Sequence, residues 1–189
     1  NLVDEYSDHG RPEGSQKVLA PYKVIALGLL TASSVRTGAI ACFGIATLIG
    51  LYLVMVIGWP VLVVSLASLA VAYLYAGGPK PLGTLGLGEP LVFVFMGLLI
   101  VMGTYYVHTL TVTIDALVLS VSVGCMVTAI LVANDLRDLE EDRMAGKRTP
   151  VTLLGRSFGR WLWISLVLSG FVTVALLATA GHMGLTLLL

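Results

Sequence analysis

The sequence predicts an all-α integral membrane protein, built as a bundle of helices that cross the bilayer. Of its 189 residues, 57% are apolar and only 12% are charged, and the mean hydropathy is +0.95. A helix needs roughly 20 apolar residues to cross a hydrocarbon core. About five apolar runs meet that length, at residues 38–57, 60–76, 90–107, 114–133 and 161–180. Because these runs carry almost no polar face, a soluble helical core is excluded.

The segments between the runs predict the remaining elements in order. Residues 17–37 are amphipathic but too interrupted to span, which favours a helix lying on the membrane surface or capping the bundle. Ser33 or Ser34 would begin the first span, and Gly58-Trp59-Pro60 forms a tight turn with Trp59 at the interface. Residues 76–90 hold five glycines and three prolines, so we expect neither helix nor strand there. Two residues would suffice for a turn, and we expect this longer loop to cover a site.

The charges divide the connections into two sides. All 11 Lys and Arg residues fall in the connections 1–37, 77–89 and 134–160, which share a side if the spans alternate. The positive-inside rule assigns that side to the cytoplasm. On the opposite side the only acidic residue is Asp115. We therefore expect a multi-pass protein of the inner or plasma membrane with its active end facing the cytoplasm.

The most informative stretch is residues 134–149, with five acidic and four basic residues directly after an apolar run. Asn134, Asp138 and Asp142 recur every four residues, which would stack them on one face of a continuous helix. Three oxygen-bearing side chains would then line up where the apolar helix ends.

A second acidic group opens the chain and has the same character. Asn1 and Glu5 are four residues apart, as are Asp4 and Asp8. Taken alone, this group of acids is typical of a solvent-exposed helix terminus. Residues 134–142 show a similar pattern on the same predicted side of the membrane. The first group is therefore interpreted as a second acidic motif that faces residues 134–142.

Two clusters of carboxylates and amides at one membrane face repel each other unless a hard divalent cation such as Mg²⁺ neutralises them. The candidate ligands are Asn1, Asp4, Glu5, Asp8, Asn134, Asp138 and Asp142. Cations for a Mg²⁺-bridged diphosphate are also present: Lys23, Lys80, Arg137, Lys147 and Arg148. No His/Cys ligand set for zinc appears, and no nucleic-acid partner is predicted. With apolar helices behind the clusters, the pattern indicates a lipid diphosphate and the ionisation of its allylic C–O bond.

At these residues the chain resembles the UbiA-type superfamily of intramembrane aromatic prenyltransferases. The pattern N-x-x-R-D-x-x-x-D-x-x-x-G-K matches their second aspartate motif at Asn134, Arg137, Asp138, Asp142, Gly146 and Lys147, and N-L-V-D-E-Y-S-D looks like the first. The resemblance implies one transmembrane domain over residues 1–189, incomplete at both ends, from a nine-helix fold with a loop-capped site. It also implies that Asp8, Asp138 and Asp142 are catalytic through Mg²⁺.

Within the superfamily, residues 75–89 and 145–155 look most like the branch that prenylates 1,4-dihydroxy-2-naphthoate. That resemblance implies transfer from a polyprenyl diphosphate, giving demethylmenaquinone, CO₂ and diphosphate. One departure stands in the first motif, where relatives usually read N-D and this chain reads Asp4-Glu5. Either Asp4 or Glu5 would therefore reach the metal.

Three other classes of membrane protein fit the sequence less well. A CDP-alcohol phosphotransferase would need D-x-x-D-G-x-x-A-R ahead of Asp138, and no such run is present. A transporter would place ionisable groups near mid-bilayer, whereas the span interiors here are uncharged. A structural subunit gives no reason for two acidic clusters on one side. Within the superfamily, a different aromatic acceptor stays open.

Overall fold

A computed structural model describes residues 2–9, 24–77 and 80–180, without the side chains of Asp8 and His9. Within these ranges the ordered elements are all helical and no strand occurs. The chain forms two compact units. Unit 1 comprises residues 1–86 with 140–148, and unit 2 comprises residues 87–139 with 149–189.

Five helices are long and apolar enough to cross a membrane, which confirms the predicted spans. They cover Ala32–Ile57, Trp59–Ala76, Gly88–Thr109, Ile114–Arg137 and Arg156–Thr179. The chain is thus a multi-pass membrane protein of the all-α class.

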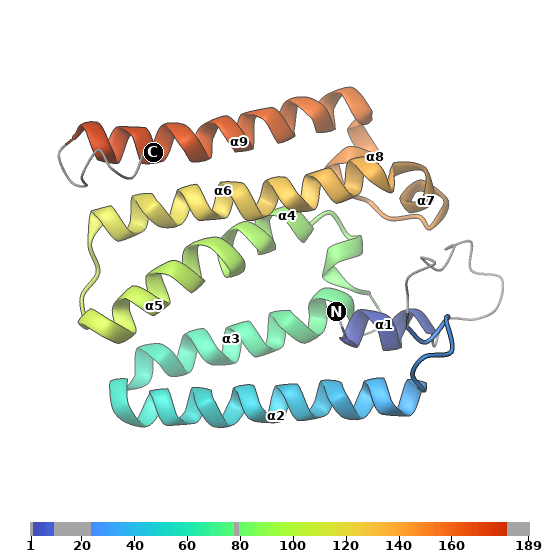
Figure 1. The fold of residues 1–189 in the computed structure, drawn as a ribbon, viewed down its shortest axis with the longest axis horizontal. Helices are drawn as coiled ribbons and strands as arrows, with labels where there is room; N and C mark the ends of the chain where they lie inside the picture. Colours follow the sequence, from blue (N-terminus) through green and yellow to red (C-terminus); the bar gives the residue numbers. More distant parts are fainter. Residues whose placement is uncertain (1, 10–23, 78–79, 181–189) are drawn as a thin grey trace. The chain divides into compact units, whose positions relative to one another are not determined.

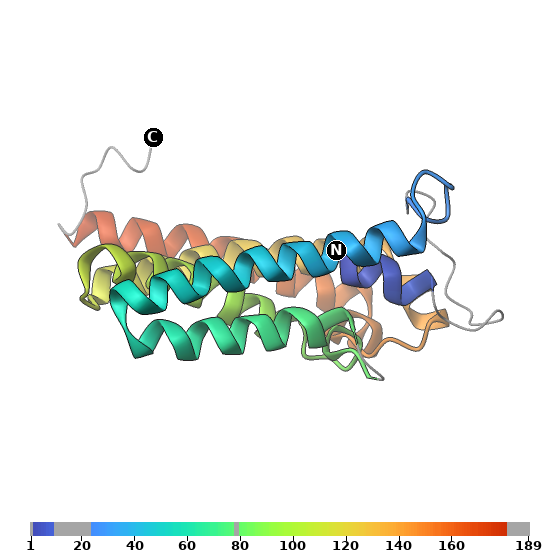
Figure 2. The same cartoon turned by 90° about the horizontal axis from the view of Figure 1, so that it is seen from below.

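Unit 1 is organised around a helical hairpin of α2 (Ala32–Ile57) and α3 (Trp59–Ala76), which lie side by side in Figure 1. The single residue Gly58 joins them at φ 109°, a conformation that side chains other than glycine rarely adopt. The short helix α1 (Leu2–His9) packs against the beginning of α2 (Figure 2). There the Arg36 guanidinium lies 5.9 Å from the centre of the Tyr6 ring, within cation–π range.

The start of α2 differs from the prediction. Residues 24–30 form turns rather than a surface helix, and residues 17–23 lie outside the described ranges. The helix begins at Ala32, because Thr31 caps it by accepting a hydrogen bond from the Ser34 N–H at 3.1 Å. The predicted cap at Ser33 or Ser34 was therefore two or three residues late.

Unit 2 is centred on α6 (Ile114–Arg137). On one side α6 packs along α9 (Arg156–Thr179), and on the other along the span formed by α4 (Gly88–Leu91), η2 (Val92–Leu99) and α5 (Ile100–Thr109), as Figure 1 shows. The element η2 is a π-helix, a form often found at functional sites. A small apolar core of Val132, Leu139 and Val151 forms where α6 ends, with Leu136, Leu162 and Leu166 against it.

Small residues let α6 and α9 approach closely, as is common between helices in membranes. A Cβ added at Gly159 would lie 2.7 Å from Leu136 Cδ2, and one at Gly170 would lie 2.6 Å from Met126 Cε. At the second crossing the Ser122 hydroxyl donates a hydrogen bond to the Gly170 carbonyl at 2.8 Å. These contacts fix α9 against one face of α6.

The glycine-rich segment 76–90 is more ordered than predicted. It contains the 3₁₀ helix η1 (Leu82–Thr84), and α4 already begins at Gly88. Glu89 is therefore a helical residue at the start of a span, and it is only 7% exposed. The expectation of neither helix nor strand across this segment was wrong.

The expected single helix through residues 134–142 was also wrong. α6 ends at Arg137, Asp138 is its C-cap with φ −95° and ψ 15°, and a new helix α7 (Leu139–Met144) follows. The Asp138 N–H still bonds the Asn134 carbonyl at 2.9 Å, so the spacing of four holds for that pair. Asp142 belongs to the next helix. The helix α8 (Pro150–Leu154) then leads into α9.

Candidate active site

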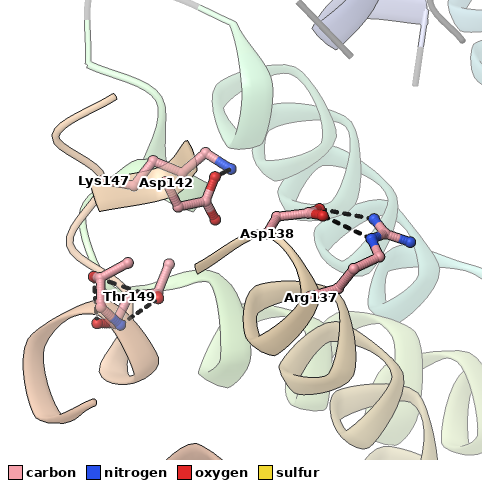
Figure 3. Close-up of polar contacts among 6 residues, drawn as sticks. Arg137, Asp138, Asp142, Lys147 and Thr149 are labelled. Carbon is pink, nitrogen blue, oxygen red and sulfur yellow. Dashed lines mark hydrogen bonds and ion pairs between the residues drawn. The ribbon is translucent and has the colours of Figure 1, made fainter. Parts of the chain in front are cut away.

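Asp138 is held by the residue before it in the sequence. Arg137 Nε donates to Asp138 Oδ1 at 2.6 Å, and Arg137 Nη2 donates to Asp138 Oδ2 at 2.7 Å (Figure 3). Such two-fold contacts between a guanidinium and a carboxylate are among the strongest hydrogen bonds in proteins. The Asp138 side chain is 32% exposed and that of Arg137 is 60% exposed. The end of α6 therefore presents a solvent-accessible carboxylate with its charge already matched.

Asp142 forms a second carboxylate–cation pair within unit 1. Lys147 Nζ lies 2.6 Å from Asp142 Oδ1, and the backbone N–H of Lys147 bonds the Asp142 carbonyl at 3.0 Å. The turn between them requires Gly146 at φ 70°. The Asp142 side chain is only 6% exposed, so Lys147 compensates a carboxylate that has lost most of its water (Figure 3).

The glycine-rich segment contacts the end of the second motif. The Arg148 N–H bonds the Thr84 carbonyl at 3.0 Å. Gly86, at φ 81°, lies so near that an added Cβ would be 2.6 Å from the Arg148 carbonyl oxygen. The Arg148 side chain itself is exposed. This contact ties residues 84–86 to the end of the second motif, and the expectation that the loop covers a site stays a prediction.

The first acidic cluster is described only in part. Glu5 Oε1 accepts a hydrogen bond from the Ile25 N–H at 3.0 Å, so this carboxylate holds the turn ahead of α2. Asp4 is half-buried on the same helix. Asn1, Lys23 and the side chain of Asp8 lie outside what the structure describes, and Lys80 is exposed.

Asn134, Asp138 and Asp142 carry side-chain oxygen atoms, which are the ligands that Mg²⁺ prefers. Within the described ranges, however, no three acidic, His or Cys residues are close enough together to enclose a metal. Asp138 and Asp142 are each engaged by a neighbouring cation instead. The carboxylate oxygens of Asp138 and Asp142 are nevertheless of the chemical kind that Mg²⁺ prefers.

Sequence reasoning missed a group of buried polar residues in unit 2. Glu89 is 7% exposed, Asp135 is 6% exposed and Thr128 is 4% exposed. A weak signal existed, because Thr128 and Asp135 are seven residues apart and so share one face of α6. Which face of α6 would be buried was not encoded in the nearly uniform apolar pattern around them.

The sequence matches the model of the UbiA prenyltransferase family over residues 9–189. It is 36% identical over 178 residues to a 1,4-dihydroxy-2-naphthoate octaprenyltransferase of Mycobacterium leprae, covering 94% of this chain and 60% of that protein. The protein of the same name from Mycobacterium tuberculosis is 36% identical over 181 residues, covering 95% of this chain and 62% of its own length. The Escherichia coli protein of that name is 33% identical over 187 residues, with 93% and 59% covered.

The chain thus spans about 60% of the length of the curated relatives that it matches. No solved structure gave a significant match.

Proposed function

Because the chain belongs to the UbiA prenyltransferase family, we propose that it transfers a polyprenyl group from a polyprenyl diphosphate to 1,4-dihydroxy-2-naphthoate. The observation that carries this proposal is the similarity to 1,4-dihydroxy-2-naphthoate octaprenyltransferases over more than nine tenths of the chain. The five apolar spans supply a bilayer setting in which a polyprenyl tail is soluble.

The reaction breaks the allylic C–O bond, and its electron pair leaves with diphosphate. A new C–C bond forms at the ring carbon that bears the carboxylate, and the C–C bond to that carboxylate returns its electrons to the ring as CO₂ departs. The protein must therefore stabilise negative charge on the leaving diphosphate. Arg137, Lys147 and Arg148 would bind its oxygens, with Lys23 and Lys80 in support.

Mg²⁺, when bound, would supply further positive charge for the leaving group. Its proposed ligands are Asp138 and Asp142, with Asn134 beside them, and Asp8 with Asp4 or Glu5 from the first motif. Glu5 also accepts a hydrogen bond from the Ile25 N–H, and both Asp4 and Glu5 remain candidates for this role. Treatment with EDTA should abolish turnover and lower the unfolding temperature, and Mg²⁺ should restore both.

We also infer that the site faces the cytoplasm, since all 11 Lys and Arg residues lie in the three connections assigned to that side. A cysteine introduced at exposed Met144 should react with a membrane-impermeant maleimide only when the cytoplasmic face is accessible. One introduced at exposed Val112 should show the opposite pattern.

The deciding experiment supplies the purified protein with a polyprenyl diphosphate and each of three acceptors: 1,4-dihydroxy-2-naphthoate, 4-hydroxybenzoate and homogentisate. We expect diphosphate release and prenylated product with the first acceptor, together with one CO₂ for each diphosphate. If only 4-hydroxybenzoate or homogentisate is prenylated, the protein is still a prenyltransferase, but the assignment of 1,4-dihydroxy-2-naphthoate as its acceptor is wrong. No turnover with any of the three would overturn the proposed activity.

A further inference from the structure

The first turns of α9 carry positive charge that no acidic residue in the same part of the sequence balances. Residues 143–189 contain five Lys and Arg residues and no Asp or Glu. Two of the five, Arg156 and Arg160, lie one turn apart on α9, and both side chains are exposed. Positive charge is thus concentrated at the end of α9 that lies beside the end of α6.

The two arginines differ in their contacts. Arg156 Nη1 donates a hydrogen bond to the Leu136 carbonyl at 3.2 Å, which ties the start of α9 to the end of α6. Arg160 makes no hydrogen bond or ion pair with residues 2–9, 24–77 or 80–180. Its guanidinium group has five N–H donors, so it is available to an anion that comes from outside these residues.

An exposed apolar stripe continues from Arg160 along α9. Ile164, Leu168 and Phe171 follow it at spacings of four, eight and eleven residues, which places them on one face of the helix. Their exposed fractions are 38%, 58% and 65%. The helix contacts α6 through a different face, where Gly170 meets that helix. The stripe therefore faces away from α6.

The length of this stripe matches one leaflet of a membrane. Eleven residues rise about 16 Å along a helix, and half of a hydrocarbon core measures about 15 Å. Trp161, next to Arg160, is 71% exposed, and tryptophan is enriched at the depth of the lipid headgroups. Arg160 would then extend its charged end to the headgroups, and Phe171 would lie near the middle of the bilayer.

A phospholipid fits this surface better than a second helix does. Small residues allow helices in membranes to approach closely, and α9 uses Gly159 and Gly170 in that way against α6. The stripe from Arg160 to Phe171 instead presents bulky side chains. The cation at its end, which no described carboxylate neutralises, favours an anionic headgroup over a zwitterionic one that brings its own positive charge.

We propose that the face of α9 formed by Arg160, Ile164, Leu168 and Phe171 binds an anionic phospholipid. The phosphate of the headgroup accepts hydrogen bonds from Arg160, and Arg156 adds positive charge one turn earlier. An acyl chain lies along the three apolar side chains. Binding at this face is independent of the proposed prenyl transfer, and it selects a lipid with a net negative charge, such as phosphatidylglycerol.

The test uses the tryptophans of α9 as reporters in a bilayer. The chain has three Trp residues. Trp59→Phe removes the one outside α9, so the remaining fluorescence comes from Trp161 and Trp163. This variant is reconstituted in vesicles of phosphatidylcholine and phosphatidylglycerol, one of which carries brominated acyl chains that quench a tryptophan on contact. Exchanging the label between the two lipids gives their relative affinity at α9.

Arg160→Gln and Arg160→Lys are made in the same background, with Arg143→Gln as the matched control. Arg143 is also a partly exposed cation, but it pairs with Glu140 on α7. Circular dichroism reports whether each variant keeps its helices. Each ratio is measured again at high salt and in the presence of inorganic phosphate, which separates a bound lipid from a bound free anion.

We expect phosphatidylglycerol to bind at α9 at least about 5-fold more tightly than phosphatidylcholine, which is the size of one arginine near an anionic lipid. Arg160→Gln should lower this ratio about 5-fold, whereas Arg160→Lys should keep most of it. Arg143→Gln should leave the ratio unchanged. High salt should lower it, and inorganic phosphate at equal ionic strength should lower it no further.

Equal affinity for the two lipids in Trp59→Phe would overturn the proposal. The same loss in Arg160→Gln and Arg143→Gln would also overturn it, because the charge of the whole membrane face would then be responsible. Displacement by inorganic phosphate would indicate a site for a free anion. Weak quenching by both lipids that increases as the protein is diluted in the membrane would show that a second copy of the chain covers the stripe. If Arg160→Gln does not fold, the salt dependence in Trp59→Phe decides, and a ratio that salt does not change would overturn the proposal.

Discussion

Two kinds of buried or half-buried carboxylate stand in contrast within the described residues. At the end of α6 and in α7, Asp138 and Asp142 each lie 2.6 Å from a cationic nitrogen supplied within five residues of sequence. At the start of α4, Glu89 is about as buried as Asp142, but no cation pairs with it within the described ranges, and no hydrogen bond of good geometry reaches its oxygens although the Asp135 carboxyl group lies beside it. The first kind is charge-matched and the second kind is not.

The two kinds of carboxylate differ in the partner that would stabilise them. A carboxylate paired with a cation exchanges partners when a metal and a diphosphate arrive together, because both charges find new partners at once. A buried carboxylate without a partner costs free energy that only a donor or a proton can recover. The two kinds of carboxylate should therefore respond differently when they are substituted.

The largest effect should come from breaking the charge-matched kind. Asp138→Asn and Asp142→Asn should each lower diphosphate release at least about 100-fold, because the leaving group loses electrostatic stabilisation. Release is measured with saturating Mg²⁺ and both substrates. Asp115→Asn, at the opposite end of α6, serves as the control and should stay near wild type. Full activity in either test variant would remove these residues from the mechanism.

Removing a cation should have the next largest effect. Lys147→Met should raise the KM for the polyprenyl diphosphate about 10-fold and should destabilise the fold, because Asp142 stays buried without its partner. Arg143→Met is matched to it, since Arg143 pairs at 3.5 Å with exposed Glu140. Equal KM values for the two variants would show that Lys147 has no special role.

Removing the carboxyl group of Glu89 should raise the stability of the protein, whereas Lys147→Met should lower it. Glu89→Met removes two buried oxygens that no hydrogen bond reaches from residues 2–9, 24–77 or 80–180, and it nearly keeps the side-chain length. It should therefore stabilise the protein by about 1 kcal/mol. Thermal unfolding in detergent, followed by tryptophan fluorescence, measures this change. A marked loss of stability would mean that Glu89 is satisfied in the native fold, and the contrast with Asp142 would disappear.

The smallest effect on stability is expected for an exposed carboxylate, that of Glu140. Glu140→Gln breaks the ion pair with Arg143, in which both side chains are largely exposed. Exposed pairs contribute little, so unfolding should change by less than about 0.5 kcal/mol. Activity should also be unchanged. A larger change in either quantity would show that a carboxylate near residues 138–147 matters without being buried.

Much of the fold followed from local sequence. The spans were predictable because an apolar helix in a bilayer satisfies its own backbone, whatever its neighbours do. The ends of the spans were less predictable. The Thr31 cap of α2 and the end of α6 before Asp138 depend on a few hydrogen bonds that the apolar pattern does not reveal. The charge pairs of the second motif are also local, because Asp138 and Asp142 each pair with a cation no more than five residues away in the sequence.

The sequence by itself determined the class of the protein, the number of spans in this chain and the residues that match the UbiA motifs. These are properties of composition and spacing along one dimension. Only the tertiary structure decided which acids are buried and with whom. It brought Gly124 against η2, and it placed Glu89, which the sequence analysis expected in a loop, in the buried first turn of α4 beside Asp135. In a chain that is apolar on every face, helix rotation is set by close glycine contacts, and those exist only after the helices have packed.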